Sequence, residues 1–375
     1  MQFTLSSGTL NNRLQSLVRV INSKNTISIL DCFLFEVAND QLTITASDNE
    51  NVMQSTIALD SCSGDGRFAM PNKTIINAVR ELPEQPLSFI VNETDYSIEI
   101  SYQNGKYNFT GLAAEDYPIA QGIEEGASAI TIDSALLAEC ISRSLFATLQ
   151  DEIRPVMSGL YFDMHPEGLT IVATDGHKLV RNRLLNIKAE EGTSSFILPP
   201  KPAQLLKGVL PHSEGDAVIR FTTRSAEVTF AEGKLKCQLI EGNYPKYETV
   251  IPKDNPNVLN IDRKSLMGAV KRVIPFASES SQLIRIHLEP GRLEVSSEDI
   301  DFATSAKEDI ACEYNDTTMD IGFKGSTVYE ILNNLSSDEV TIQLADPSRA
   351  GLIVPTVQPE NQNILMLIMP MLLND

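Results

Sequence analysis

No stretch of this sequence is both apolar and long enough to span a membrane. The longest apolar run, residues 364–373, has ten residues and is interrupted by Pro370, so we interpret it as a last buried strand followed by a short tail. The first five residues lack the basic start and the apolar run of a signal peptide. These absences predict a soluble cytoplasmic protein that has no membrane partner.

Cysteine and histidine are too scarce and too scattered to form a cross-linked or metal-binding framework. The odd number of cysteines, with no CxxC, predicts neither disulfides nor a zinc knuckle and fits a reducing compartment. The four histidines are equally dispersed. We therefore expect no metal and no cofactor. The residues concerned are Cys32, Cys62, Cys140, Cys237, Cys312, His165, His177, His212 and His287.

Motifs of catalysis and of nucleotide binding are also missing. The sequence has no GxSxG elbow, no P-loop and no GxGxxG. Asp175 and His177 could be imagined in a Ser-His-Asp triad, but two triad members two residues apart on one turn would point in different directions. We expect a protein that is not an enzyme.

Basic residues are in the minority, since 30 Lys and Arg stand against 50 Asp and Glu and give a formal net charge of −20. Taken alone, this balance argues against a nucleic-acid partner, because phosphates repel acidic surfaces. The hydrophobic content of 42% over 375 residues is enough for several cores, so nothing indicates disorder.

The sequence does contain a threefold repeat. Residues 42–48, 169–175 and, more loosely, 293–299 each alternate apolar with small or polar residues, as half-buried strands do, and end on an acidic turn. The final aspartates, Asp48, Asp175 and Asp299, are 127 and 124 residues apart. One carboxylate in each repeat is better explained as a turn residue that caps a strand end than as a metal ligand.

Two further landmarks keep the same interval. One leads into a helical pattern at residues 68–73, 196–201 and 321–324, and the other closes each repeat at Tyr117-Pro118, Tyr244-Pro245 and Met369-Pro370. Glycine, proline and charged residues cluster as linkers do near 122–126 and 252–256. The sequence therefore predicts three similar domains at 1–124, 125–252 and 253–375, each of a usual size for one core.

Each repeat is expected to contain two helices among strands. Apolar residues at helical spacing predict helices over 7–24, 71–82, 133–149, 199–210, 262–278 and 324–335. Alternating runs predict strands over 32–37, 42–46, 52–59, 87–91, 97–102, 106–112, 159–163, 169–173, 217–221, 226–230 and 234–240.

The six helical segments hold 13 of the 30 basic residues but only 5 of the 50 acidic ones. Solvation explains a charged face on any single helix. Six helices biased in the same way favour a second explanation, in which the repeat brings them onto one positive surface that suits a phosphate backbone.

Three motifs resemble those of one family, the bacterial DNA sliding clamp, which is the beta subunit of DNA polymerase III. They are residues 173–179, where the family usually has Arg in place of Lys178; residues 244–247 followed by Val250-Ile251-Pro252; and Met369-Pro370-Met371. The resemblance covers the whole chain.

The resemblance implies an α+β fold of three similar domains, each with antiparallel sheets outside and two helices inside. Two chains would form a six-domain ring, a homodimer that encircles duplex DNA without reading its sequence. The ring would act as a non-catalytic processivity factor in the cytoplasm, on the chromosome. Its partners would be the polymerase III catalytic subunit, the clamp loader, other polymerases and repair proteins, all bound through short peptides.

The resemblance also implies three sets of site residues. A peptide pocket between domains two and three would contain Met157, Thr174, Gly176, His177, Lys178, Leu179, Pro245, Val250, Leu367, Met369, Pro370 and Met371. Positions facing the duplex would include Lys24, Lys73, Arg80, Arg154 and Lys201. An edge strand carrying Tyr107 and Phe109 would pair across the dimer interface, with Phe276 as an apolar partner.

The sequence departs from the family pattern at two places. Pro155 and Val156 stand where the family often carries two tyrosines associated with single-stranded DNA. The chain also continues past Met371 to Asp375, where the family commonly ends soon after an arginine. The alternative interpretation is an acidic repeat scaffold that binds only proteins.

Overall fold

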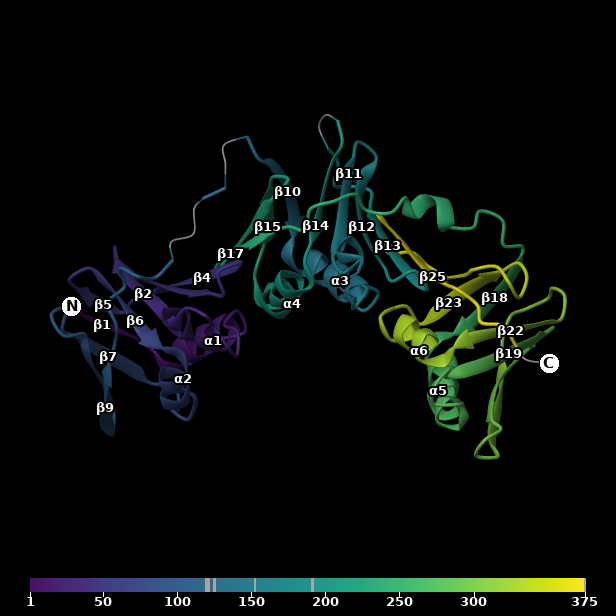
Figure 1. Ribbon diagram of the computed structural model, residues 1–375, viewed down its shortest axis with the longest axis horizontal. Helices are drawn as coiled ribbons and strands as arrows, with labels where there is room; N and C mark the ends of the chain where they lie inside the picture. Colours follow the sequence, from purple (N-terminus) through teal and green to yellow (C-terminus); the bar gives the residue numbers. More distant parts are fainter. Residues whose placement is uncertain (119–121, 124–125, 152, 190–191, 374–375) are drawn as a thin grey trace. The chain divides into compact units, whose positions relative to one another are not determined.

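The computed structural model describes residues 1–118, 122–123, 126–151, 153–189 and 192–373. The chain forms two compact units, whose helices and strands are labelled in Figure 1. The first unit comprises Met1–Ala138 and Lys201–Leu239, and the second comprises Glu139–Pro200 and Ile240–Asp375. In both units antiparallel strands form the sheets. No helix in the described ranges is long and apolar enough to cross a membrane.

The first unit contains an eight-stranded and a five-stranded sheet. In spatial order the larger sheet is β10 (Ser128–Asp133), β15 (Asp216–Phe221), β16 (Ser225–Phe230), β17 (Gly233–Gln238), β4 (Asn51–Ala58), β3 (Gln41–Ser47), β2 (Cys32–Ala38) and β6 (Gly66–Pro71). The smaller is β5 (Ser61–Ser63), β1 (Gln2–Ser6), β7 (Pro86–Val91), β8 (Ser97–Tyr102) and β9 (Gly105–Thr110). The helices are α1 (Ser7–Leu17), α2 (Asn72–Arg80) and, from Lys201 on, α4 (Pro200–Val209).

The second unit has the same plan. Its eight-stranded sheet is β14 (Ser194–Leu198), β11 (Leu160–His165), β12 (Gly168–Thr174), β13 (Lys178–Leu184), β25 (Gln362–Ile368), β24 (Gly351–Pro355), β23 (Glu339–Leu344) and β18 (Asn257–Asp262). Its four-stranded sheet is β21 (Thr304–Ala311), β20 (Arg292–Asp299), β19 (Leu283–Glu289) and β22 (Met319–Lys324). Helices α5 (Arg263–Val273) and α6 (Gly325–Asn333) belong here, as does most of α3 (Ser134–Leu145).

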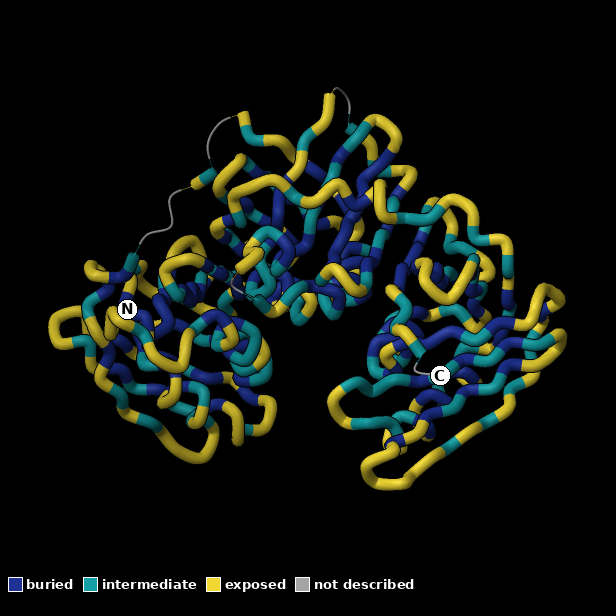
Figure 2. Tube along the Cα trace, turned by 45° about the vertical axis from the view of Figure 1, so that its right-hand side comes forward, coloured by how far each residue is buried: buried dark blue, intermediate teal, exposed yellow. Residues whose placement is uncertain are grey.

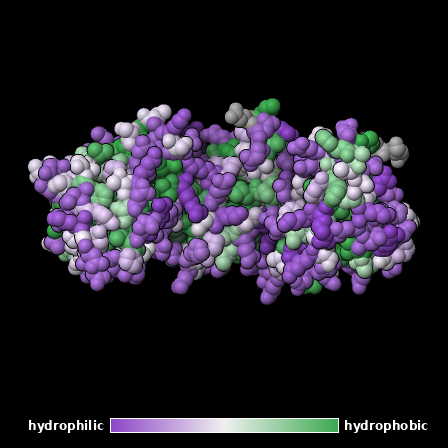
Figure 3. All heavy atoms as spheres, turned by 90° about the horizontal axis from the view of Figure 1, so that it is seen from below, coloured by the Kyte–Doolittle hydropathy of each residue, from purple (hydrophilic) through white to green (hydrophobic). Residues whose placement is uncertain are grey.

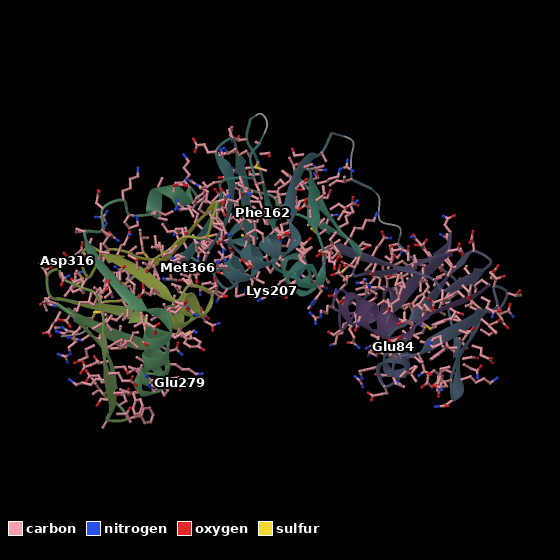
Figure 4. All side chains as sticks on the ribbon, turned by 180° about the vertical axis from the view of Figure 1, so that it is seen from behind. Glu84, Phe162, Lys207, Glu279, Asp316 and Met366 are labelled. Atoms are coloured by element: carbon pink, nitrogen blue, oxygen red, sulfur yellow. The ribbon has the colours of Figure 1, made fainter. Side chains whose placement is uncertain are left out.

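Alternation along the strands builds the cores. Buried and less buried residues alternate along β11 and β19, so one face of each strand packs inward. Stacked aromatic pairs fill the interiors, with ring centroids 4.7 Å apart for Phe3 and Phe89 and 4.6 Å for Phe162 and Phe196. Phe162 and Met366, labelled in Figure 4, are almost fully buried. Figure 2 shows the buried segments along the strands and the exposed ones at the turns.

Polar side chains start several of the helices. The Oγ atom of Ser6 accepts a hydrogen bond of 3.0 Å from the N–H of Thr9, and Oδ1 of Asp262 accepts one of 2.7 Å from Ser265. All six predicted helices end earlier than the apolar spacing predicts, three of them by four residues or more. Helix α1 stops at Leu17 instead of residue 24, α3 at Leu145 instead of 149, and α5 at Val273 instead of 278.

The physical reason is clearest for two of these helix ends. After α1 the N–H of Val20 bonds to the carbonyl of Leu17 in a tighter turn, and the carbonyl of Val20 accepts a hydrogen bond from Lys201. After α5 the chain continues as a short 3₁₀ turn, Ile274–Phe276, whose central Pro275 has no N–H with which to continue an α-helix.

The repeated aspartates are turn residues, as the sequence predicts. Oδ1 of Asp48 accepts the N–H groups of Glu50 and Asn51 at 3.0 and 2.6 Å. Oδ1 of Asp175 accepts two N–H groups at 2.8 and 2.9 Å, and Oδ1 of Asp299 two at 3.0 and 3.1 Å. Each carboxylate therefore closes the turn that joins two strands. In the described ranges no group of three or more His, Cys, Asp or Glu could hold a metal ion.

Candidate functional site

Two of the sequence motifs meet in the second unit. Strands β13 and β25 pair along their whole lengths, with Leu179 opposite Leu367. Beyond the paired strands, the N–H of Met369 donates a hydrogen bond of 2.8 Å to the carbonyl of His177. The turn after β12 and the segment after β25 therefore lie side by side, although they come from different repeats.

An apolar cluster forms the floor of this site. Leu179 and Leu367 are buried in it, whereas Val250 and Met369 remain 58% and 41% exposed. An apolar floor with exposed apolar side chains beside it is suited to covering by a partner's apolar side chains. The cluster consists of Val172, Leu179, Tyr247, Ala350, Leu352, Leu365 and Leu367, with Tyr161, Tyr244, Ile251 and Val354 packed against it.

The backbone conformation of the turn, and not a lack of space, requires glycine at position 176. Gly176 has φ of +92°, which side-chain-bearing residues rarely adopt. A Cβ atom at Gly176 would lie 3.7 Å from Nη1 of Arg154 and 4.0 Å from Cε of Met157. Thr174 fixes the same turn, since its Oγ1 donates to the carbonyl of Lys178 at 2.7 Å and accepts the N–H of Gly176 at 3.1 Å.

The ammonium group of Lys178 is mostly buried and is paired with carboxylates of the same chain. Its Nζ lies 3.1 Å from Oε2 of Glu330 on α6, 3.4 Å from Oδ2 of Asp175 and 5.5 Å from the ring centroid of Phe146. The side chain is only 12% exposed. Lys178 therefore connects β13 to α6 and adds little free positive charge to the pocket. No sequence motif pointed to Glu330 or Phe146, because both lie far from the motifs along the chain.

The linker between β17 and β18 covers the outer face of the sheet. The hydroxyl of Tyr247 donates a 3.0 Å hydrogen bond to Oδ2 of Asp163, and Nη2 of Arg183 binds Oε1 of Glu248 at 2.9 Å. Burial, and then the nearby Asp163 carboxylate, raise the pKa of Tyr247 above its ordinary value. Tyr247 thus remains a neutral donor and anchors the linker.

A cavity of about 540 Å³, lined by both charged and aromatic residues, borders the same linker. It shares only Pro245 with the predicted pocket, and its lining includes Asp163, His165, Arg183 and Glu248. Of the remaining pocket residues, Met157 is buried, while His177 and Pro245 are exposed. Pro370 is half-buried, and the N–H of Met371 bonds to the carbonyl of Gly322 at 2.8 Å, so the end of the chain is tied to β22.

The helices carry exposed basic side chains, as expected. Lys73, Arg80, Lys207, Lys264 and Lys271 are exposed on α2, α4 and α5. Lys207 is labelled on α4 in Figure 4, and the face of the molecule drawn in Figure 3 is largely hydrophilic.

Three of the residues predicted to face the duplex are not exposed on a helix as Lys73 and Arg80 are. Lys24 lies in an exposed segment beyond the end of α1, and Arg154 lies at the Gly176 turn. The Nζ atom of Lys201 binds Oδ2 of Asp48 at 2.5 Å, the carbonyl of Val20 at 2.7 Å and Oδ1 of Asn22 at 2.6 Å. The charge of Lys201 is therefore already neutralised within the first unit.

The Asp48–Lys201 pair joins the first repeat to the second. The side chain of Asp48 is only 3% exposed. Burial opposes its ionisation, but hydrogen bonds from Lys201 and Asn51 outweigh that effect and hold the pKa of Asp48 below its ordinary value.

We expect Asp48→Asn to lower the free energy of unfolding at pH 7 by about 1–3 kcal/mol, because it leaves the Lys201 charge without its partner but keeps the Oδ1 acceptor of the turn. Since the folded pKa is depressed, the contribution is complete above the ordinary aspartate pKa and is lost as the pH falls through the lower folded value. Urea unfolding of both proteins at pH 7 and at acid pH checks this: the difference between them should shrink in acid, and a constant difference would contradict it.

The aromatic residues predicted at the dimer interface lie on an open edge. Tyr107 and Phe109 are half-exposed on β9, the last strand of its sheet, with ring centroids 6.1 Å apart. Phe276 is 40% exposed in the 3₁₀ turn that follows α5.

Known proteins match this chain over almost its whole length. Models for the N-terminal, central and C-terminal domains of the DNA polymerase III beta subunit match residues 1–121, 131–246 and 248–372. The beta sliding clamp of Caulobacter vibrioides is 27% identical over 374 residues, which span 98% of this chain and 99% of that protein. The beta sliding clamp of Pseudomonas aeruginosa PAO1 is 25% identical over 99% of this chain and 100% of that protein. The crystal structure of the DNA polymerase III beta subunit from the same species superimposes with a TM-score of 0.91 at 24% identity, covering 100% of both chains.

The fold, together with the β13–β25 site, defines a DNA sliding clamp. The chain belongs to the DNA polymerase III beta subunit family. The resemblance seen in the sequence is thereby confirmed, and the alternative of an acidic scaffold that binds only proteins is not supported.

Proposed function

We propose that two copies of this chain close into a ring around duplex DNA and hold DNA polymerase III on it, as a non-catalytic processivity factor acting on the chromosome in the cytoplasm. Each copy would contribute three domains, at 1–124, 125–252 and 253–375. The observation that carries the proposal is the strand pairing between repeats. Among the described residues it leaves two edge strands, β21 and β9, without the kind of partner that their equivalents in the other repeats have.

The repeats pair through equivalent strands. Strand β4 of the first repeat pairs with β17 of the second, and β13 of the second repeat pairs with β25 of the third. Strands β4, β13 and β21 are equivalent, since each follows one of the aspartate turns, and β9, β17 and β25 are each the last strand of their repeat. The remaining members, β21 and β9, are both edge strands. Antiparallel pairing of β21 with β9 of a second copy would satisfy both edges in a two-fold dimer.

Asn108→Pro tests this pairing. Just beyond the Ser97–Thr110 end of the β8–β9 ladder, the N–H of Gly111 donates to the carbonyl of Tyr96 at 2.8 Å, so strand alternation turns the N–H of Asn108 outward. Proline there removes an edge donor while the bonds between β8 and β9 remain. We expect the unmodified protein to sediment as a dimer at micromolar concentration and Asn108→Pro as a folded monomer. Asn108→Ala, which keeps the N–H, is the matched control, and a dimeric Asn108→Pro would contradict the pairing.

The exposed lysines and arginines of the helices would contact phosphates and would not read bases. They supply attraction that does not depend on sequence, whereas the overall charge of −20 limits ordinary adhesion to DNA. The apolar site at β13 and β25 would receive short peptides of the polymerase III catalytic subunit, the clamp loader, other polymerases and repair proteins. Two copies of this site in one ring would hold two partners close together.

A further inference from the structure

In two of the three aspartate turns the two carboxylate oxygens have the same division of roles. At Asp48, Oδ1 accepts backbone N–H groups and Oδ2 binds Nζ of Lys201 at 2.5 Å. At Asp175, Oδ1 again accepts backbone N–H groups and Oδ2 lies 3.4 Å from Nζ of Lys178. Two of the three turns therefore place a lysine ammonium on the second carboxylate oxygen.

Strand register identifies the residue equivalent to Lys201 in the first repeat. Leu34 pairs with Thr45 on one side and with Ala69 on the other, and Tyr161 pairs with Val172 and Ile197 in the same way. Ala69 and Ile197 are thus equivalent. Four residues further along the chain stand Lys73 and Lys201, both at the start of a helix.

The third turn has no ammonium of its own. Asp299 pairs with Thr304 across a turn two residues longer than the others, and Thr304 stands where the second repeat has Lys178. Asp299 is nonetheless buried, and Lys73 is exposed. Among the described residues neither of them forms an ion pair within the chain.

The longer turn also exposes two large apolar side chains. Ile300 and Phe302 are 85% and 80% exposed, an unfavourable position for both unless a partner covers them. In the other two junctions the turn bonds to a residue at the end of the neighbouring strand. The carbonyl of Glu50 accepts the N–H of Gln238, the last residue of β17, at 3.2 Å, and the carbonyl of His177 accepts the N–H of Met369, the residue after β25, at 2.8 Å.

We propose that the turn 299–303 is the element that locks two copies of this chain together, with Asp299 binding Lys73 of the partner subunit while Ile300 and Phe302 pack beside the end of the partner's β9. The inference rests on the proposed ring, because only the pairing of β21 with β9 brings the turn to that place. The strand-end residue equivalent to Gln238 is Thr110, and Leu112, two residues beyond it, is 46% exposed. An apolar surface therefore stands where Ile300 and Phe302 would arrive. Lys73 would then serve the interface between subunits and would not face DNA.

A double-mutant cycle tests the ion pair. Asp299→Asn keeps the Oδ1 acceptor of the turn and removes the charge, and Lys73→Gln removes the opposite charge. We expect each single change to raise the dissociation constant of the dimer about tenfold, and the double change to raise it no further than either alone. Sedimentation equilibrium measures the constants, and thermal melting of each variant confirms that it is folded. Effects that multiply in the double variant, or single changes without effect, would overturn the pair.

The apolar side chains require a separate variant. Ile300→Ser with Phe302→Ser should raise the dissociation constant about a hundredfold. Val357→Ser is the control, since Val357 is 80% exposed on a loop of the same unit. A dimer unaffected by the double serine change would overturn the packing and leave the ring intact. An unmodified protein that is monomeric at micromolar concentration would instead refute the ring itself, and with it the proposed contact between the turn 299–303 and the partner subunit.

Discussion

Replacing Val250 and Met369 together by serine will weaken the binding of a polymerase-tail peptide about a hundredfold. Each change removes an apolar side chain that is 58% or 41% exposed in the free protein and that the bound peptide would cover. Burying one such side chain contributes roughly 1.5–3 kcal/mol at most, and partial burial contributes less. Because both side chains are exposed, the melting temperature should hardly change. Fluorescence anisotropy with a labelled peptide measures the affinity.

Substitution is a sharper test than removing the end of the chain. Met369 and Met371 donate backbone hydrogen bonds to His177 and Gly322, so truncation would disturb the fold and the site together. Val357→Ser, in the same unit and 80% exposed, controls for the loss of an exposed valine. Retained peptide affinity in the Val250→Ser, Met369→Ser variant would exclude this surface as the peptide site.

Reversing three helix charges will sharply reduce retention on circular DNA. In the variant Arg80→Glu, Lys207→Glu, Lys271→Glu each new carboxylate replaces an exposed cation on α2, α4 or α5. Losing three phosphate contacts should lower the apparent affinity at least tenfold at low salt and flatten its dependence on salt concentration. Gel filtration of loaded, nicked circular DNA at increasing salt measures retention.

The control must separate local charge from net charge. Arg67→Glu, Lys188→Glu, Lys253→Glu changes the net charge by the same amount, at three exposed positions outside the helices. Lys201 is unsuitable for this experiment, because its ammonium is bound to Asp48 and its reversal would damage the first unit. Equal losses in both triple variants would show that overall repulsion, and not the helix surface, governs retention.

Periodicity in the sequence was sufficient for much of the fold. Strand β8 has the bounds 97–102 that alternation predicts, and the strand predicted over 217–221 begins one residue earlier, at Asp216. The aspartate turns were recognisable because Asp and Asn side chains readily cap such turns. Strand β13 was missed, since Lys178, Arg181 and Arg183 make its sequence look like a polar loop. Those charges are neutralised by Glu330 and Glu248, which come from distant parts of the chain.

The candidate site residues likewise fall into those that the sequence could predict and those that it could not. Leu179 and Leu367 follow from their motifs, and the structure brings them into register on neighbouring strands. What the sequence could not reveal is which charges are already occupied. Lys178 and Lys201 look like free cations in a pattern of residues, yet both are held by carboxylates. Such pairing depends on the tertiary arrangement, which local patterns do not contain.

The sheets that cross between repeats also determine where the chain can be cut. Cleavage near residue 124 or 252 would separate β17 from β4 and β25 from β13, and would uncover long strand edges that are paired in the intact chain. Fragments made at these linkers should therefore aggregate, although each has the length of an ordinary domain. Backbone amides of β4 and β13 should be among the slowest to exchange with deuterium, because opening them requires a whole unit to unfold. Because each compact unit includes one junction between repeats, we expect the cooperative folding unit of this clamp to be the junction, and not the repeat itself.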